Sequence, residues 1–140
     1  MNRLVLGLGV CLLATFAMAA DRMAPAPGAE VYFISPQDGA TVSSPVTVRF
    51  GLKGMGIAPA GIKFDNTGHH HLLVDTDISE VNLDVPMPAT DKIVHFGKGQ
   101  TETALTLAPG KHTLQLVFAD YLHTSFDPPL HSKKITITVE

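Results

Sequence analysis

Residues 69–76 read His-His-His-Leu-Leu-Val-Asp-Thr, and this stretch decides the fold. Its apolar residues Leu72, Leu73 and Val74 are consecutive, so both faces of a strand formed here would be apolar. A strand of this kind lies inside a sheet and is covered on both sides. We therefore expect residues 69–76 to form the central strand of a layered β structure.

The rest of the chain carries the period-two alternation of strands, without convincing helical periodicity. Residues 135–139, for example, place Ile135, Ile137 and Val139 on one face. Turn material such as Pro109-Gly110 separates the runs. Strands are expected at residues 31–35, 46–52, 69–76, 93–96, 101–107, 111–119 and 135–139.

This number of short strands predicts an all-β fold, an immunoglobulin-like antiparallel β-sandwich of about seven strands. A cupredoxin-like Greek-key barrel is the alternative. Long connections at residues 53–68, 77–92 and 120–132 carry most of the polar chemistry. Long loops on a compact β scaffold are where function is usually found.

The first twenty residues have the pattern of a secretory signal peptide. Arg3 gives a basic start, residues 4–16 are apolar, and Ala17-Met18-Ala19 resembles a cleavage site. We expect cleavage near Ala19/Ala20 and a periplasmic or secreted product. The expected organisation is a signal peptide at residues 1–20, a flexible lead-in at residues 21–29 and an immunoglobulin-like domain at residues 30–140.

Composition narrows the chemistry of the exported domain. The only cysteine, Cys11, lies in the expected signal peptide, so neither a disulfide nor a thiolate is expected afterwards. Without residues 1–20 the chain keeps nine basic and thirteen acidic residues, a net charge of −4, and its charges are scattered. We expect no nucleic-acid partner and no membrane insertion after cleavage. Any metal site would use imidazole, carboxylate or thioether ligands.

Three consecutive histidines open the central strand. Because side chains alternate along a strand, His69 and His71 share one face and His70 lies on the other. Two imidazoles two residues apart can bind one metal ion, and histidine is a common ligand of zinc and copper. The triplet also suits a structural polar network, so both interpretations stay open.

Strand pairing predicts which residues lie near the triplet. In an immunoglobulin-like sandwich the third strand pairs antiparallel with the penultimate one, which brings the triplet to Asp120 and His123. The candidate metal site is therefore His69, His70, His71, Asp120 and His123. Asp120 is a ligand, an acceptor that orients a ligating imidazole, or a turn cap. Ring nitrogens of His69 or His71 within about 4–5 Å of His123 would favour a metal site.

The other histidines are assigned lesser roles. His112 and Asp75 are expected to pair at the opposite end of the central strand as a structural contact. His95 is expected on an edge strand without an obvious partner. His131, at the far end of the loop that holds His123, is expected to be solvated.

Several stretches of the chain together resemble a bacterial exported family, domain of unknown function 4399. They are GHHHLLVD at residues 68–75, APGKHTLQLVFAD at residues 108–120 and LHTSFDPPLHS at residues 122–132. The resemblance spans most of residues 31–139 and implies no activity, because none is assigned to that family. It implies that the characteristic polar positions are His69, His70, His71, Asp75, His112, Asp120 and His123.

Two functions remain as hypotheses. The first is a periplasmic, non-enzymatic protein that binds a transition-metal ion, copper or zinc, through the histidine end of the sandwich. The second is an immunoglobulin-like interaction module for an envelope protein or a glycan, with structural histidines. We expect a monomer, and we expect no enzyme because the sequence contains no nucleophile elbow or ordered catalytic set.

Overall fold

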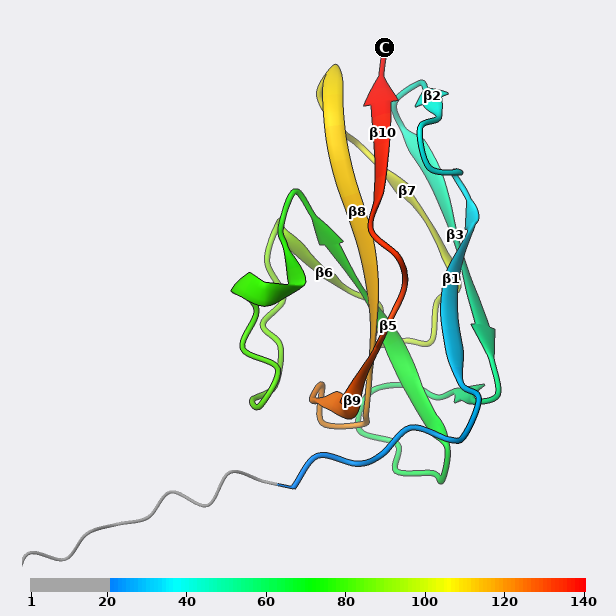
Figure 1. Ribbon diagram of the computed structural model, residues 1–140, viewed down its shortest axis with the longest axis vertical. Helices are drawn as coiled ribbons and strands as arrows, with labels where there is room; N and C mark the ends of the chain where they lie inside the picture. Colours follow the sequence, from blue (N-terminus) through cyan, green and yellow to red (C-terminus); the bar gives the residue numbers. More distant parts are fainter. Residues whose placement is uncertain (1–20) are drawn as a thin grey trace, which may run out of the picture.

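The strands form two sheets that face one another in this computed structural model, which describes residues 21–140 (Figure 1). The expected signal peptide at residues 1–20 lies outside the described residues. Over residues 21–140 the sheets do not close into a barrel, so the fold is the expected β-sandwich and not the alternative barrel. No helix in this part of the chain is long and apolar enough to cross a membrane.

The smaller sheet has the strand order β1-β3-β7. The larger has the order β2-β10-β8-β5-β4, with β6 paired to β5 and β9 paired to β8. The strands are β1 Glu30–Ser35, β2 Thr41–Val42, β3 Val46–Lys53, β4 Gly56–Ile57, β5 Thr67–Val74, β6 Ile93–His95, β7 Glu102–Leu105, β8 Gly110–Ala119, β9 Ser125–His131 and β10 Ile135–Val139.

The inner faces of the two sheets form the main core. Alternation along the strands puts Val48 and Phe50 of β3 in the same buried cluster as Leu72 of β5 and Leu116 and Phe118 of β8. Burying a side chain of this size stabilises the fold by about 1.5–3 kcal/mol. This layer therefore holds the two sheets together.

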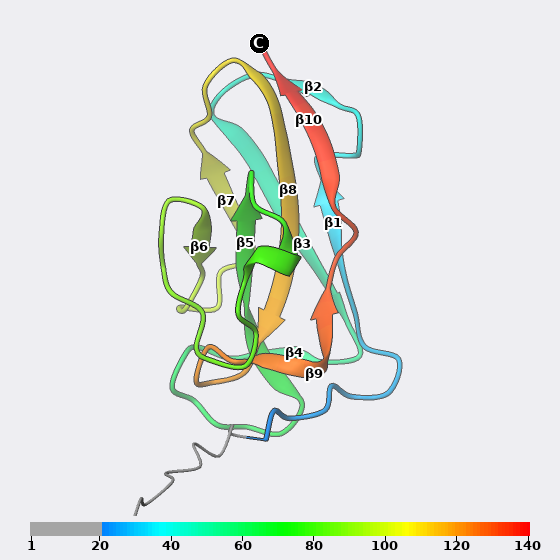
Figure 2. The ribbon, with the colours of Figure 1, turned by 60° about the vertical axis from the view of Figure 1, so that its left-hand side comes forward.

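The central strand of the larger sheet is β5, as the sequence predicts. It pairs antiparallel with β8 on one side and with β6 on the other. Seven of its eight residues are buried, because its outer face is covered as well. The cover is the segment at residues 75–92, which crosses over β5 and β8 on the side away from β1 and β3 (Figure 1, Figure 2). We call residues 75–92 the cover segment.

A second, smaller core lies under the cover segment. Met87 of this segment and Ile93 of β6 pack against Leu73, Val117 and Ala119 on the outer face of the larger sheet. The apolar side chains on the second face of β5 and β8 are thereby removed from water, as the consecutive Leu-Leu-Val run requires.

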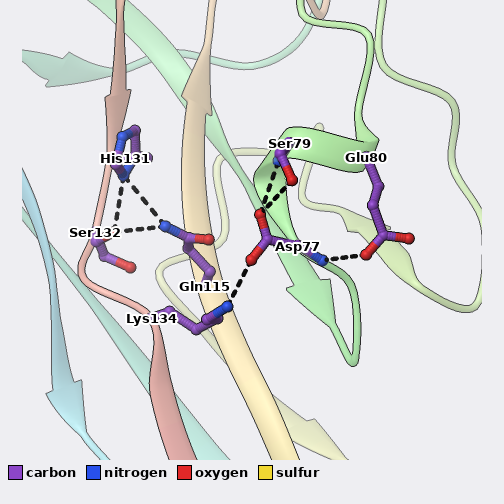
Figure 3. A network of polar contacts seen from close by, with 7 residues as sticks. All are labelled: Asp77, Ser79, Glu80, Gln115, His131, Ser132 and Lys134. Atoms are coloured by element: carbon purple, nitrogen blue, oxygen red, sulfur yellow. Dashed lines mark hydrogen bonds and ion pairs between the residues drawn. The ribbon is translucent and has the colours of Figure 1, made fainter.

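A short 3-10 helix, η1 Ile78–Glu80, anchors the start of the cover segment. The carboxylate of Asp77 accepts a hydrogen bond from the backbone N–H of Ser79 at 2.9 Å, and Glu80 accepts one from the N–H of Asp77 at 3.1 Å. Asp77 also accepts from Nζ of Lys134, next to β10, at 2.6 Å. These contacts, shown in Figure 3, tie the cover segment to the sheet.

Arg22 ties the lead-in at residues 21–29 to the same cover segment. Its Nη2 lies 2.9 Å from the carboxylate of Asp127 in β9, and its Nε lies 3.4 Å from that of Asp84. Its Nη1 donates to the carbonyl of Leu83 at 3.3 Å. One guanidinium thus bridges the cover segment and the larger sheet.

β9 occupies a stretch that the sequence predicts to be a loop. The dipeptide Pro128-Pro129 is typical of turns, which led to the expectation of a long connection. The structure accommodates both prolines because β9 lies at an edge and pairs with β8 alone among the described strands. A missing backbone N–H is tolerated at such an edge. The two-residue strands β2 and β4 are too short to produce an alternation.

Candidate metal centre

Four histidines come together on the outer face of the larger sheet. His69 and His71 lie on β5, His95 on β6, and His123 in the turn between β8 and β9. Each offers one ring nitrogen, and these nitrogens all lie within 4.8 Å of one another. The four side chains are therefore close enough to bind one metal ion, and we call them the four-histidine group.

The ring nitrogens converge around His69. Its Nε2 lies 3.1 Å from Nδ1 of His123 and 3.2 Å from Nε2 of His95. Bonds of about 2.0–2.1 Å to a tetrahedral ion place two ligating nitrogens about 3.3 Å apart. The observed separations are close to this value, so small side-chain movements would direct the lone pairs onto one ion.

Strand pairing explains why the triplet meets His123. β5 and β8 run antiparallel with His69 opposite Ala119, so the start of β5 lies beside the end of β8. The chain then turns through residues 120–124 and returns His123 to the triplet. The expected approach of His69 and His123 is thus confirmed, and it is closer than the expectation required.

His95 is the member of the group that sequence reasoning missed, and the expectation that it has no partner is wrong. β6 pairs with β5 so that His95 lies directly opposite His71. A three-residue strand gives too little alternation to fix that register. One feature pointed to the position of His95. Ile93 and His95 share a face of β6, and Ile93 is buried in the second, smaller core under the cover segment.

Gly97 makes room for the ring of His95. A Cβ atom at residue 97 would overlap the His95 imidazole. The glycine two residues after His95 is therefore required for this ring to lie against His69 and His71.

Asp120 shapes the turn that carries His123. Its Oδ1 accepts hydrogen bonds from the N–H of Leu122 at 2.8 Å and of Thr124 at 3.0 Å. His123 has a φ of 67°, a left-handed conformation that is uncommon for a residue other than glycine. Asp120 lies outside the four-histidine group. Of its three expected roles, the structure places it as the turn cap.

His70 faces away from the group, because neighbouring side chains of β5 point to opposite faces. It lies in the main core, with its ring centroid 5.1 Å from that of Phe50 and 5.0 Å from that of Phe118. Neither of its ring nitrogens has a hydrogen-bond partner among the described residues. The structure does not bring His70 together with the other candidate ligands.

Burial keeps the imidazoles of His69, His71 and His95 neutral. Loss of hydration, followed by the neighbouring histidines, lowers the pKa of His69 to about 4 and that of His71 to about 2. Burial and then His123 also lower the pKa of His95. A metal ion binds the neutral imidazole. At neutral pH these side chains are therefore in the form that binds.

The remaining histidines lie elsewhere. Nδ1 of His112 lies 2.7 Å from Asp75 and its Nε2 lies 2.8 Å from the carbonyl of Ala108, which confirms the expected pair. The hydrogen bond with Asp75 raises the pKa of His112. His131 is exposed and donates from Nδ1 to the carbonyl of Ser132 at 2.9 Å, outside the group (Figure 3).

Comparison with known proteins gives a family and no activity. No curated protein and no solved structure matches the chain. The family described as Domain of unknown function (DUF4399) matches residues 48–140. This range includes β5, β6, β8 and the turn after β8, and therefore all four histidines of the group. Because the match covers more than half of the sequence, the chain belongs to the DUF4399 family.

Proposed function

We propose that the protein binds a transition-metal ion, copper or zinc, through His69, His71, His95 and His123. The convergence of four ring nitrogens within 4.8 Å of one another carries this proposal. Imidazole ligands suit zinc and copper, whereas calcium and magnesium take oxygen ligands. The group therefore matches the class of metal as well as the number of ligands.

The number of ligands supports binding without catalysis. Catalytic zinc sites use three protein ligands and leave the fourth position to water or substrate, whereas structural sites use four protein ligands. Four histidines would complete a tetrahedral shell, so we propose that the protein holds the ion and catalyses no reaction. The expected signal peptide supports action in the periplasm or outside the cell, and we propose that the protein acts there as a monomer.

Calorimetric titration of the purified exported protein with Zn²⁺, Cu²⁺ and Cu⁺ tests the proposal. We expect one ion per chain, and a loss of affinity of about a hundredfold or more when His69 and His71 are both replaced by Gln, because direct ligands matter at least as much as the groups that support them. His131→Gln is the matched control, since His131 lies outside the group, and its affinity should equal that of the wild type.

The wild-type protein must bind tightly for the proposal to hold. The proposal fails if the wild type binds none of the ions. It also fails if the folded double variant, checked by circular dichroism, binds as tightly as the wild type.

An interaction module is the second candidate, and exposed apolar side chains favour it. Phe64 is 72 % exposed and Leu122 is 53 % exposed. Their loops lie side by side, because the N–H of Gly61 donates to the carbonyl of Tyr121 at 2.9 Å. An envelope protein or a glycan would bind at this end of the sandwich. The titration separates the two candidates, because only the first requires tight metal binding.

A further inference from the structure

We infer that the four-histidine group is a closed tetrahedral cage that selects an ion with a filled d shell, Zn²⁺ or Cu⁺, against Cu²⁺ and Ni²⁺. This inference rests on the proposed metal binding and adds to it which ions the site prefers. The arrangement of the four rings in space carries it.

The six distances between ring centroids describe a slightly distorted tetrahedron. Four of them are 5.0 Å, namely His69 to each of the other three and His71 to His95. The other two are 4.6 Å between His95 and His123 and 6.0 Å between His71 and His123. In a regular tetrahedron all six distances are equal, and here five of the six lie between 4.6 and 5.0 Å.

A square arrangement of the same rings would look different. Both diagonals of a square are about 1.4 times its sides, so around a square-planar ion two pairs with no histidine in common would both be longer than the other four pairs by this factor. The longest observed pair is His71 and His123 at 6.0 Å, while the pair made by the other two rings, His69 and His95, is 5.0 Å apart. Since no two such pairs are long together, the rings do not lie in a square.

Rigid elements hold the rings in this arrangement. His69 and His71 are fully buried on the central strand, and His95 is fixed opposite His71 by the pairing of β5 with β6. His123 is held in the turn that Asp120 caps. Flattening the group would move β5 against β6 or open the turn, so an ion that requires a square would lose a ligand or strain the fold.

The electronic structure of the ions then decides the preference. Zn²⁺ and Cu⁺ have filled d shells, and such ions have no geometric preference that arises from d electrons. Cu²⁺ and Ni²⁺ favour square-planar or tetragonal sites. An unconstrained nitrogen site binds Cu²⁺ most tightly of the divalent first-row ions. The tetrahedral cage reduces that advantage and stabilises Cu⁺ relative to Cu²⁺.

Competition between Zn²⁺ and Ni²⁺ tests the cage, with a hexahistidine peptide as the unconstrained control. We expect the protein to prefer Zn²⁺ over Ni²⁺ by about tenfold or more beyond the preference of the peptide, because only the protein opposes a square shell. Co²⁺ bound to the protein should show the intense visible absorption of a tetrahedral ion. A preference equal to that of the peptide, or the weak bands of octahedral Co²⁺, overturns the inference and leaves metal binding as such intact.

Titrations with Cu⁺ and Cu²⁺ complete the test. Anaerobic titration with Cu⁺ against a colorimetric chelator, beside Zn²⁺ against its own chelator, ranks the two filled-shell ions, and tight binding of either supports the cage. Cu²⁺ bound with an ordinary tetragonal electron paramagnetic resonance spectrum overturns it. His123→Gln removes one corner and should abolish the preference for Zn²⁺ over Ni²⁺. If no ion binds at all, both the inference and the proposed function fail.

Discussion

His70 shows what happens to an imidazole in an apolar core. It is 1 % exposed, lies against Phe50 and Phe118, and has no hydrogen-bond partner among the described residues for either nitrogen. Leaving a buried polar group without a partner costs about 1–3 kcal/mol. Burial lowers the pKa of His70 to about 4, because the charged ring would lose its hydration. His70 therefore weakens the core in which it sits.

Replacing His70 by Leu tests this argument through the pH dependence of stability. The unfolded chain takes up a proton on this residue near its ordinary pKa of 6.5, whereas the folded chain does so near 4. Stability is therefore fully present above pH 6.5 and is lost as the pH falls toward 4, by up to about 1.4 kcal/mol per pH unit for each such group. The free energy of unfolding of H70L at pH 7 should be about 1–2 kcal/mol higher than that of the wild type. It should also fall less steeply as the pH is lowered.

Urea denaturation at a series of pH values measures both effects. Because His70 faces away from the four-histidine group, H70L should keep the metal affinity of the wild type. His69→Leu, on the opposite face of the same strand, should abolish tight binding. A less stable H70L protein would show that the ring makes a favourable contact that burial and geometry do not reveal.

At the level of strands, the sequence predicts the pairing that brings together three of the four histidines, His69, His71 and His123. The apolar patterns indicate the two strands, and the expected immunoglobulin-like topology places residues 69–76 beside residues 111–119, which brings His69 to His123. The sequence does not predict the position of His95, because the register of β6 depends on backbone hydrogen bonds. Three residues do not encode that register in their side chains. The sequence does not predict strand β9 either, because its prolines have the local preferences of a turn. They are tolerated in a strand only because β9 lies at an edge.

The capped turn after β8 yields a prediction that separates two roles of Asp120. Asp120→Ala removes the acceptor for the N–H groups of Leu122 and Thr124, and metal affinity should fall about 10–100-fold as His123 loses its position. Asp120→Asn should restore nearly all of the affinity, because an Asn side-chain oxygen accepts the same hydrogen bonds in a turn. Calorimetric titration of both variants provides the measurement.

The difference in metal affinity between Asp120→Ala and Asp120→Asn shows whether Asp120 caps the turn or binds the ion. A carboxylate that bound the ion directly would be replaced poorly by a neutral amide. Loss of affinity in Asp120→Asn as large as that in Asp120→Ala would therefore assign Asp120 to the metal itself. Circular dichroism of Asp120→Ala distinguishes a local change in the turn from unfolding of the domain.

In the whole molecule, the candidate site lies on the face of the larger sheet that carries the cover segment. His69 and His71 are buried there, whereas His95 and His123 are partly exposed. The carbonyl of His123 accepts a hydrogen bond from the N–H of Met87 at 2.9 Å, which links the cover segment directly to the group. The stability of the cover segment should therefore influence how long an ion stays bound.

Arg22 offers a way to test this link from a distance. Its guanidinium joins Leu83 and Asp84 of the cover segment to Asp127 of β9. Because the carboxylates are exposed, Arg22→Gln should lower the free energy of unfolding by less than about 1 kcal/mol. It should nevertheless speed hydrogen exchange in residues 78–92 and increase the rate of metal release several-fold, because local opening needs less free energy than global unfolding.

Arg49→Gln provides the matched control for this last prediction. Arg49 also forms an ion pair, with Glu102 at 3.1 Å, but both side chains are exposed and lie on the smaller sheet, away from the cover segment. Its loss should change neither exchange in residues 78–92 nor metal release. If Arg22→Gln gives the same unchanged profile by mass spectrometry, the lead-in does not hold the cover segment. The lifetime of the bound ion would then depend on the pairing of β5, β6 and β8 and on the turn capped by Asp120.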